Sequence, residues 1–513
     1  MTYIAPNSTV QFFGDLSLNP NYDDTLYFAS TAAKDSYFDG LTKLATASAL
    51  SYTREQRNFL RVELPMSRLI NASYIRFKNT SFENKWFYAF VKNVEYINNN
   101  CTQVNFELDV MMTWMGTFTL HECFIERQHT VGDEIGANIC DEGLETGEYI
   151  CEGTLKTDLF ENYAIYIFQS EDVEGEVGGV VYGGIYSGLF MYYCQSVASA
   201  NQQIEAMINA NKADSIVMIM MLPTSFIPDH IVGSAEPTTN AVNIPKPYYS
   251  LNGYIPRNKK LYVYPYCFLT VYNTEGTAID YRYEYFNTLP DDTSTGNAQF
   301  EVRASINAQP EITCYPKNYK GFSKAYSEKI SITNFPKCAW GVDAYKAYIA
   351  MQQSNLPVAL SNARTQIMAG MAMGRPLMSA LGAYSGLKDI SNLLSTQIIH
   401  PSMPSHAKGQ QTNDLFVGMK AKNFYFYQMC ITKNYAMMID SYFDMYGYAV
   451  RQHGVPNMNA RPNWTYVKTV GCAIGGDIPA DDAKAIEDIF NNGVRFWKNH
   501  NNIGNYSLAN APV

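Results

Sequence analysis

Alternating apolar and polar positions predict β-strands through the first ~150 residues. From residue 103 to residue 110 every second side chain is apolar: Val104, Phe106, Leu108 and Val110. An aromatic run, Trp86–Val94, precedes this stretch, and the three asparagines at 98–100 supply a turn between them. Side chains of a strand point alternately to its two faces, so the pattern predicts a half-buried β-hairpin.

A mixed α and β pattern follows between residues 161 and 222. Tyr163–Phe168 and Ile216–Leu222 are continuous apolar runs that are typical of buried strands. Between them, one predicted helix face is formed by Val197, Ala200, Ile204, Met207 and Ile208. The glycine-rich stretch Gly178–Gly188 lacks the spacing of a phosphate-binding loop, and we interpret it as a turn between aromatic strands.

Strand patterns return in the second half of the chain. They are predicted in residues 261–273, Tyr281–Phe286, Phe300–Ile306 and Asn423–Ile431. Near the C-terminus, Pro479 begins and Gly493 ends a helix whose apolar face is formed by Ala483, Ile486, Ile489 and Phe490. The predicted fold class is therefore mainly β (α+β), with antiparallel β domains and an inserted mixed domain.

The alternation is interrupted by an apolar insertion that we place at residues 344–411. No Asp or Glu lies between Asp343 and Asp389, in a chain that carries 48 of them. Within it, Thr365–Leu387 is rich in Met and Gly and has the single charge of Arg375. This stretch is as long as a membrane-spanning helix, which needs roughly 20 residues.

Insertion energies argue against a resident membrane span. Arg375 near the middle costs about 2.5–3.5 kcal/mol, whereas each large aliphatic residue returns only about 0.3–0.6 kcal/mol. The aliphatic residues are Ile367, Leu377, Leu381 and Leu387. Gly374 and Pro376 would also interrupt a helix. We therefore predict a flexible, kinked apolar segment within a soluble protein.

Two interpretations of this segment remain open at the level of sequence. It could form Ala- and Met-rich core helices, or it could be a functional loop. We favour the loop, because Gly and Met specify a unique core poorly and a polar stretch, His400–Asp414, follows. His400 and His406 are interpreted as solvated histidines, with pH sensing as the alternative. The candidate functional residues are Leu356, Ile367, Met368, Gly370, Met371, Met373, Gly374, Leu377, Met378, Leu381, Gly382, Tyr384, Gly386 and Leu387.

Composition narrows the possible functions. The formal charge of −10 and pI of about 5.3 do not favour tight nucleic-acid binding, which depends on neutralising phosphates. An acidic stretch, Asp133–Glu152, could hold Ca²⁺, line a channel or form a solvated loop; we favour the solvated loop. No signal peptide is predicted, so synthesis is expected in a cytoplasm, with the ten cysteines as buried thiols.

No catalytic or metal-binding motif is present, and we predict neither an enzyme nor a cofactor. The densest reactive cluster consists of His121, Glu122, Cys123, Glu126 and His129. On a strand, Cys123 and His129 would lie about 20 Å apart, too far for a catalytic pair. We interpret them as a buried thiol and a structural histidine.

Three stretches together resemble a known family. They are Asn71–Tyr96 with Val104–Met115 and Cys123–His129; Ile439–Asn457 with Asn463–Asp482; and Ile489–Asn510. They are similar to the tail-knob, or distal tail-tube, proteins of small short-tailed bacteriophages that infect Gram-positive bacteria. The resemblance covers the N-terminal ~130 and the C-terminal ~90 residues.

The resemblance implies an assembly. It implies a homohexamer that forms a closed tube at the virion tail tip, assembled in the host cytoplasm, without enzymatic activity. The implied partners are other tail proteins (a collar or connector protein above, a wall-degrading tip protein below), the host cytoplasmic membrane, and viral DNA passing without specific binding. The implied division is a tube-forming β domain at 1–130 and 412–513, a middle region at 131–343, and the loop at 344–411.

Three functional hypotheses follow. In the first, the loops plug a conduit for genome ejection and are released to perforate the host membrane. In the second, the protein is a receptor-binding or cell-wall-degrading tail protein. In the third, it is only a wall of the tube, and the apolar segment is an interface helix pair. The first agrees best with an acid-free apolar segment bracketed by β-structure.

Overall fold

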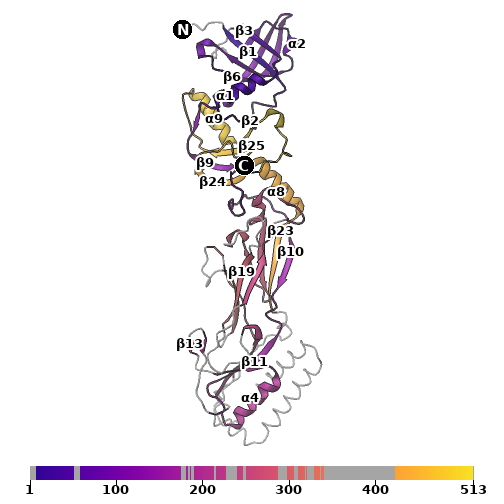
Figure 1. Ribbon diagram of the computed structural model, residues 1–513, viewed down its shortest axis with the longest axis vertical. Coiled ribbons are helices and arrows are strands. Elements are labelled where there is room, and N and C mark those ends of the chain that lie inside the picture. The colour runs from indigo at the N-terminus through magenta and orange to yellow at the C-terminus, as the bar shows by residue number, and fades with distance from the viewer. Residues whose placement is uncertain are drawn as a thin grey trace, which may run out of the picture. The chain divides into compact units, whose positions relative to one another are not determined.

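The computed structural model divides the chain into two compact units (Figure 1). Unit 1 consists of Met1–Glu148, Tyr249–Tyr266 and Ile431–Val513, and unit 2 of Tyr149–Tyr248 and Cys267–Cys430. The structure describes residues 7–50, 58–174, 181–182, 185–186, 190–212, 215–226, 240–246, 250–286, 297–305, 310–317, 319–320, 328–335, 337–339 and 422–511. The units are defined by packing, so the predicted division of the chain by role stays a prediction.

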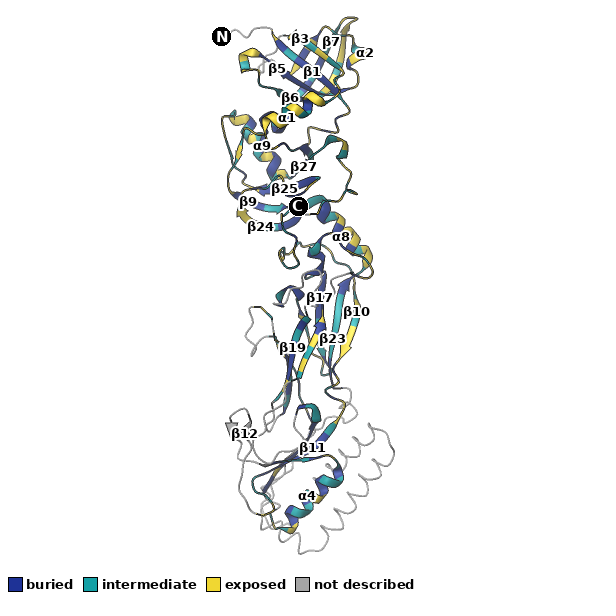
Figure 2. Cartoon of the chain, in the orientation of Figure 1, coloured by how far each residue is buried: buried dark blue, intermediate teal, exposed yellow. Residues whose placement is uncertain are grey.

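The N-terminal part of unit 1 is a strongly curled sheet. Among the described residues its strands follow the order β3 (Ala45–Leu50), β1 (Ser8–Gly14), β5 (Ala72–Lys78), β6 (Phe87–Asn98), β7 (Cys101–Leu108) and β4 (Phe59–Val62). The edge strands β3 and β4 contact each other, so the sheet curls around an apolar core. Phe12, Ile75, Phe77 and Phe106 belong to that core, and Figure 2 shows the buried parts of the strands in dark blue.

The predicted hairpin is confirmed as β6 and β7, which pair antiparallel across a turn at Asn99 and Asn100. One boundary of the prediction is wrong. Val110 is not the last residue of the strand but the first residue of a short helix, α3 (Val110–Trp114). The Asp109 carboxylate accepts a hydrogen bond from the amide of Met112 at 2.9 Å and so caps this helix.

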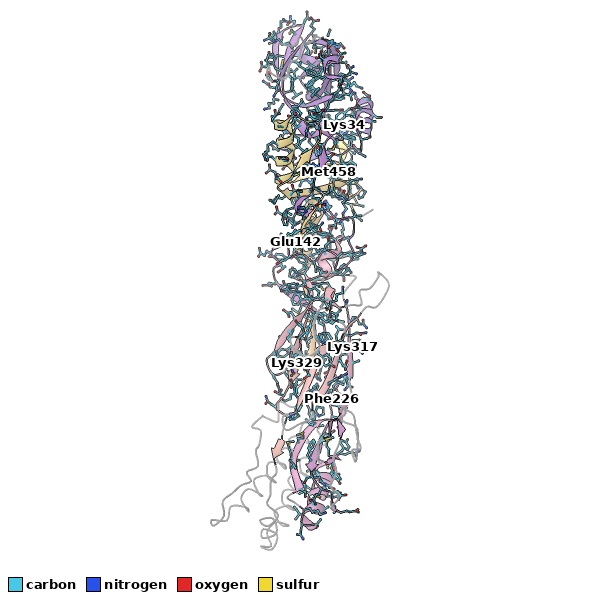
Figure 3. The ribbon with its side chains drawn as sticks, turned by 90° about the vertical axis from the view of Figure 1, so that its left-hand side faces the viewer. Lys34, Glu142, Phe226, Lys317, Lys329 and Met458 are labelled. Atoms are coloured by element: carbon cyan, nitrogen blue, oxygen red, sulfur yellow. The ribbon has the colours of Figure 1, made fainter. Side chains whose placement is uncertain are left out.

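A buried lysine joins α3 to the helix α1 (Thr31–Gly40). Lys34, labelled in Figure 3, is 2% exposed, and its ammonium group donates to the carbonyl oxygens of Met112 at 2.7 Å and Met115 at 3.1 Å. These carbonyls have no partner within the helix, so the lysine satisfies them. Burial lowers the pKa of Lys34 to about 8.

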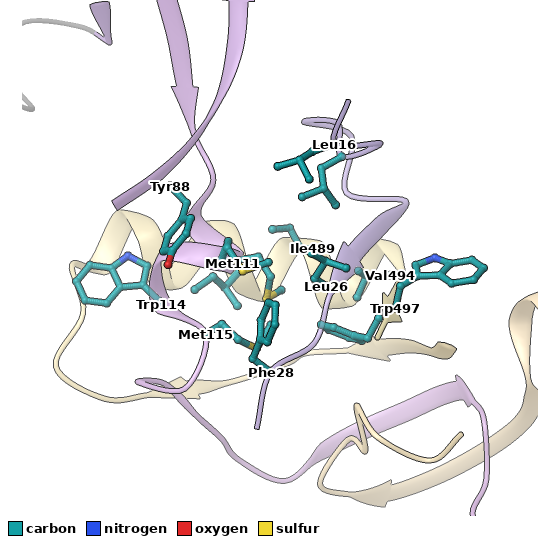
Figure 4. Packing of buried hydrophobic residues seen from close by; sticks show 14 of the residues in the cluster. Leu16, Leu26, Phe28, Tyr88, Met111, Trp114, Met115, Ile489, Val494 and Trp497 are labelled. Atoms are coloured by element: carbon teal, nitrogen blue, oxygen red, sulfur yellow. The ribbon is translucent and has the colours of Figure 1, made fainter. Parts of the chain in front are cut away.

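The second sheet of unit 1 has the order β2 (Asp24–Leu26), β27 (Val494–Trp497), β25 (Trp464–Val470), β9 (Cys123–Gln128) and β24 (Tyr448–Gly454) within the described part of the chain. Helix α9 (Ala480–Asn492) packs against it, with Pro479 before its first residue and Gly493 after its last, as predicted. Figure 4 shows Ile489 of α9 beside Leu26, Val494 and Trp497. This aromatic core also receives Tyr74 and Tyr88 from the outer face of the curled sheet.

Unit 2 contains three four-stranded antiparallel sheets and one two-stranded sheet within its described residues. The first has the order β10 (Tyr149–Lys156), β23 (Phe424–Ile431), β17 (Cys267–Asn273) and β18 (Ala278–Tyr281). The second has the order β16 (Asn240–Pro245), β19 (Asn297–Ser305), β20 (Glu311–Pro316) and β21 (Ile330–Ile332). Phe426 of β23 packs on Phe300 of β19 with ring centroids 5.1 Å apart, so these two sheets share a core.

The third sheet of unit 2 has the order β14 (Phe190–Cys194), β11 (Tyr163–Gln169), β15 (Ile216–Pro223) and β22 (Lys337–Ala339). Helix α4 (Val197–Asn209) packs on β11 and β14. The predicted strands β11 and β15 and the predicted helix α4 are thus confirmed. Within the glycine-rich stretch, β12 (Val181–Tyr182) pairs with β13 (Ile185–Tyr186).

Two predicted strands are partly wrong. Residues 261–266 do not extend β17, because Lys259–Tyr262 is a 3₁₀ helix. Tyr283–Tyr285 is also a 3₁₀ helix, and the strand β18 ends at Tyr281. Tyr281 of the strand and Tyr283 of the 3₁₀ helix are both fully buried. A run of apolar residues therefore does not by itself distinguish a strand from a tight helical turn.

The predicted fold class, mainly β with antiparallel sheets, is confirmed; the pair β2–β27 is parallel. The cysteine prediction is only partly right. None of the nine cysteines whose side chains the structure describes forms a disulfide, but Cys151 is exposed and Cys101 and Cys140 are half-buried.

Candidate functional site: the neck of the apolar segment

The candidate residues from Leu356 to Leu387 lie outside the described residues, as do His400 and His406. The structure does describe the part of unit 2 where the chain leaves for this segment and returns from it. On the N-terminal side are Thr333, Phe335 and β22, and on the C-terminal side are Lys422, Asn423 and β23. This site can therefore be built from its anchoring residues.

Strand β23 returns the chain into the middle of a sheet. It lies between β10 and β17, and Phe424 to Cys430 face Asn273 to Cys267 in antiparallel register. Phe424 and Phe426 are fully buried, whereas Tyr425 and Tyr427 are half-buried on the other face and stack with centroids 6.2 Å apart. A central strand with one buried face has a firmly specified register.

The two sides of the segment meet at Lys422. Its ammonium group donates to the carbonyl oxygen of Thr333 at 2.7 Å and forms an ion pair with Glu275. It also lies 5.5 Å from the ring centroid of Phe335. Thr333 and Phe335 precede residues 336–421 in the sequence and Lys422 follows them, so these contacts join the two described ends of that stretch. We call Glu275, Thr333, Phe335, Lys422 and Asn423 the neck.

Glu275 connects the neck to the turn after β17. Its Oε2 accepts from the backbone amide of Thr333 at 2.9 Å and from the Thr333 hydroxyl at 3.0 Å, while Oε1 pairs with Lys422. The side chain of Asn273 fixes this turn by accepting from the amides of Glu275 at 3.1 Å and Thr277 at 2.8 Å. One carboxylate thus binds both sides of the segment.

Asn423 attaches the returning chain to β10 and to the same turn. It is 1% exposed, and its amide group donates to the carbonyl oxygen of Thr157 at 2.8 Å and accepts from the Thr157 hydroxyl. Its backbone amide donates to the Thr274 hydroxyl at 3.2 Å. Since a buried amide that loses its partners costs about 1–3 kcal/mol, Asn423 is a firm point of attachment.

The neck was not found from the sequence. Lys422 is 89 residues from Thr333 and 147 residues from Glu275 along the chain. The only available signal was position: polar residues, Thr333 and Lys422, lie on either side of a long acid-free segment.

The acidic stretch of unit 1 corrects another prediction, because it is not simply a solvated loop. The Glu142 side chain is 0% exposed; it forms ion pairs with Arg127 and Lys260 and accepts from the amide of Ala449 at 2.9 Å. Asp133 is also buried, and it accepts from the Tyr448 hydroxyl and from the amide of Lys259 at 3.1 Å. These carboxylates bind other parts of unit 1, and no cluster with metal-binding composition occurs among the described residues.

The cluster around Cys123 and His129 does not assemble a catalytic pair. Cys123 is 3% exposed, and its thiol contacts that of Cys472. The His129 ring accepts from the Tyr466 amide at 2.7 Å through Nδ1, and Nε2 lies 3.2 Å from the Asp444 carbonyl oxygen. Both residues are buried and structural.

Within the described part of the chain, no helix combines the length with the apolar character that crossing a bilayer requires.

Comparison with known proteins agrees with the fold. A family model described as "Bacillus phage phi29, Tail knob protein gp9, C-terminal domain" matches residues 233–511, and one described as "Caudoviral major tail protein N-terminus" matches residues 6–119. The tail knob proteins gp9 of Bacillus phages PZA and phi29 are each 24% identical to this chain, over 99% of it and 100% of their own length. The solved structure of the bacteriophage C1 tail knob protein, gp12, matches with a TM-score of 0.62 at 15% identity, covering 97% of this chain and 98% of that one. The first family model spans more than half of the chain, so the protein belongs to the phage tail knob family and is a component of the virion tail.

Proposed function

We propose that six copies of this tail knob protein assemble into a closed conduit through which the phage genome leaves the virion. Residues 356–399 of each copy plug the lumen before infection. During infection these segments are released and perforate the host cytoplasmic membrane. The protein acts through assembly and not through catalysis, and its neighbours in the tail are a collar or connector protein and a wall-degrading tip protein.

The neck is the observation that carries this proposal. A segment that moves while its subunit stays in place needs a fixed base, and Lys422 and Glu275 supply one by joining the chain before and after the segment. Between these anchors the sequence has no Asp or Glu from residue 344 to residue 388. An apolar segment of this length on a polar base supports a detachable element better than part of a rigid core.

Assembly would overcome the poor insertion of a single segment. One copy cannot offset the cost of Arg375 with four aliphatic residues. Six copies inserting together could place Arg375 and the exposed backbone along a protein-lined, water-filled pore, where polar groups find partners. The overall charge of −10 suits a conduit for DNA, because an acidic wall does not hold phosphates.

Deletion of residues 360–395 tests the role of the segment. Full-length protein is expected to release dye from anionic liposomes, and the deletion variant is expected to release none while it still forms rings in electron micrographs. Phage carrying the deletion should bind host cells but fail to deliver DNA.

The outcomes distinguish the alternatives. Loss of the rings on deletion would support an interface helix pair instead. Leakage that survives deletion would place membrane activity elsewhere. Clearing of a cell-wall suspension by the purified protein would support a wall-degrading tail protein.

A further inference from the structure

Two buried cysteines face each other on the strand pair that carries the neck. Cys267 of β17 is paired in register with Cys430 of β23, and the two residues are 0% and 1% exposed. At the other end of the same two strands, Asn273 is paired with Phe424, next to Asn423 of the neck. The thiols therefore lie on the framework that holds the base of residues 336–421.

The hydrogen-bond pattern shows which kind of pair they form. The amide of Ile431 donates to the carbonyl oxygen of Tyr266 at 3.0 Å, which makes that neighbouring pair a hydrogen-bonded one. Such pairs alternate along antiparallel strands, so Cys267 and Cys430 form a non-hydrogen-bonded pair. The amide of Asn273 donates to Thr277 at 3.0 Å, on the β18 side. Cys267 is six positions earlier and so also directs its amide away from β23, which agrees.

Non-hydrogen-bonded pairs bring side chains closest together. Their Cα atoms are about 4.5 Å apart, within the range of about 4.4–6.8 Å that disulfides require. Both side chains lie on the same buried face, as partners in register must. The strand pair therefore presents two thiols at a typical spacing that is compatible with a disulfide.

We propose that Cys267 and Cys430 are a redox site that closes to a disulfide once the virion has left the reducing host cytoplasm. The oxidant is a low-molecular-weight disulfide. One protein thiolate attacks it and displaces a small thiol, and the second attacks the resulting mixed disulfide and displaces the other. The protein loses two protons and two electrons, and the small disulfide is reduced to two thiols.

The bond would fix the base of the apolar segment covalently. It closes a loop from residue 267 to residue 430, which contains the neck and residues 344–411. If the contacts of the neck were lost, the bond would still hold β17 to β23. Burial raises the pKa of the Cys267 thiol, so oxidation is slow and the finished bond resists reduction.

The other thiol pair provides the comparison. Cys123 and Cys472 also contact each other. The pairing of β9 with β25 ends at Val470 with Phe124, so Cys472 lies beyond the paired region. The strand register therefore does not oppose Cys123 to Cys472, whereas it does oppose Cys267 to Cys430. We therefore assign the redox site to Cys267 and Cys430.

Thiol mapping on the full-length protein tests this assignment. Protein purified with reductant is divided, and one half is incubated in air with oxidised glutathione. Both halves are denatured in acid, alkylated, digested without reductant and analysed by mass spectrometry. A peptide linking Cys267 to Cys430 is expected only in the oxidised half. Oxidation should also lower the unfolding equilibrium constant roughly tenfold or more.

Variants provide the controls. In Cys430→Ser the linked peptide and the oxidation-dependent change in unfolding should both disappear, whereas Cys123→Ser should keep both. If Cys430→Ser does not fold, the mapping of the wild-type protein still decides the question. The assignment is overturned if Cys267 and Cys430 are both still alkylated after prolonged incubation of the folded protein with oxidised glutathione, or if either is linked to another cysteine.

Discussion

Two ion-pair centres, one in each unit, differ in how far they are removed from water. In unit 1 the Glu142 side chain is 0% exposed, and its partners Lys260 and Arg127 are 1% and 11% exposed. In the neck of unit 2, Lys422 and Glu275 are 10% and 19% exposed. Both centres join distant parts of the chain through one carboxylate, but only the Glu142 carboxylate, with its partner Lys260, is shut off from water.

The difference in exposure predicts how much each centre contributes to stability. Removing one member of an enclosed pair strands an uncompensated charge and costs about 3–5 kcal/mol. A partly exposed pair can be rehydrated, because water reaches its atoms when it separates. We therefore expect the Glu142 centre to resist the loss of one partner more strongly than the neck does.

The largest expected effect follows from Glu142→Gln. Arg127 and Lys260 would stay buried without their carboxylate, so we expect the free energy of unfolding to fall by about 3–5 kcal/mol. Denaturant titration followed by circular dichroism measures this. Glu145→Gln, an exposed neighbour in the same stretch, should change it by less than about 0.5 kcal/mol. A loss below about 1 kcal/mol for Glu142→Gln would remove the contrast.

Low pH should lower the free energy of unfolding of unit 1 through the protonation of His129. Burial, followed by the charge of Arg461, lowers its pKa to about 3 in the folded protein, from 6.5. The unfolded chain therefore binds the proton first, and this stabilisation is present above pH 6.5 and is lost as the pH falls toward 3. Between about pH 7 and pH 4 the free energy of unfolding should fall by about 3 kcal/mol because of His129.

The measurement is the unfolding free energy against pH for the wild type and for His129→Gln. Asp444 has a pKa raised to about 6 by burial and contributes the opposite slope in both proteins, so the difference between the curves isolates His129. Parallel curves would show that the histidine does not titrate as expected.

Substitution in the neck should lower the free energy of unfolding by less than Glu142→Gln does. For Lys422→Met we expect a loss of about 1–2 kcal/mol, because two hydrogen bonds from a charged donor disappear while Glu275 gains water. Hydrogen exchange should speed up at residues 333–335 and 422–424. The control is Lys329→Met, which breaks an exposed pair with Glu311 in the same unit and should cost less. Equal costs for the two variants would mean that the neck is an ordinary surface pair.

High salt should produce the smallest effect, a weaker coupling energy between the charged partners, and only at the neck. At ~1 M NaCl the screening length falls to about 3 Å, so the coupling energy of Lys422 with Glu275 in a double-mutant cycle should fall by up to about 0.5 kcal/mol. The coupling of Lys260 with Glu142 should stay constant, because the ions cannot enter an enclosed site. Equal salt dependence at both centres would contradict their difference in exposure.

The sequence by itself determined most of the local structure. Alternation located β7, aromatic and apolar runs located β6, β11 and β23, and terminal signals located α9. The exceptions, Lys259–Tyr262 and Tyr283–Tyr285, are buried turns whose apolar composition equals that of a strand. Sequence also defined the acid-free segment, because charge composition is a property of the chain and needs no fold.

Only the tertiary structure decided which polar residues meet. Glu142 had every local sign of a solvated acid, and its partner Lys260 is 118 residues away. The neck and the Cys267–Cys430 pair likewise depend on which strands become neighbours and in what register. Periodicity specifies which face of a strand is buried, but burial of a charge is favourable only when an opposite charge arrives from elsewhere in the chain, and that is a property of the folded molecule.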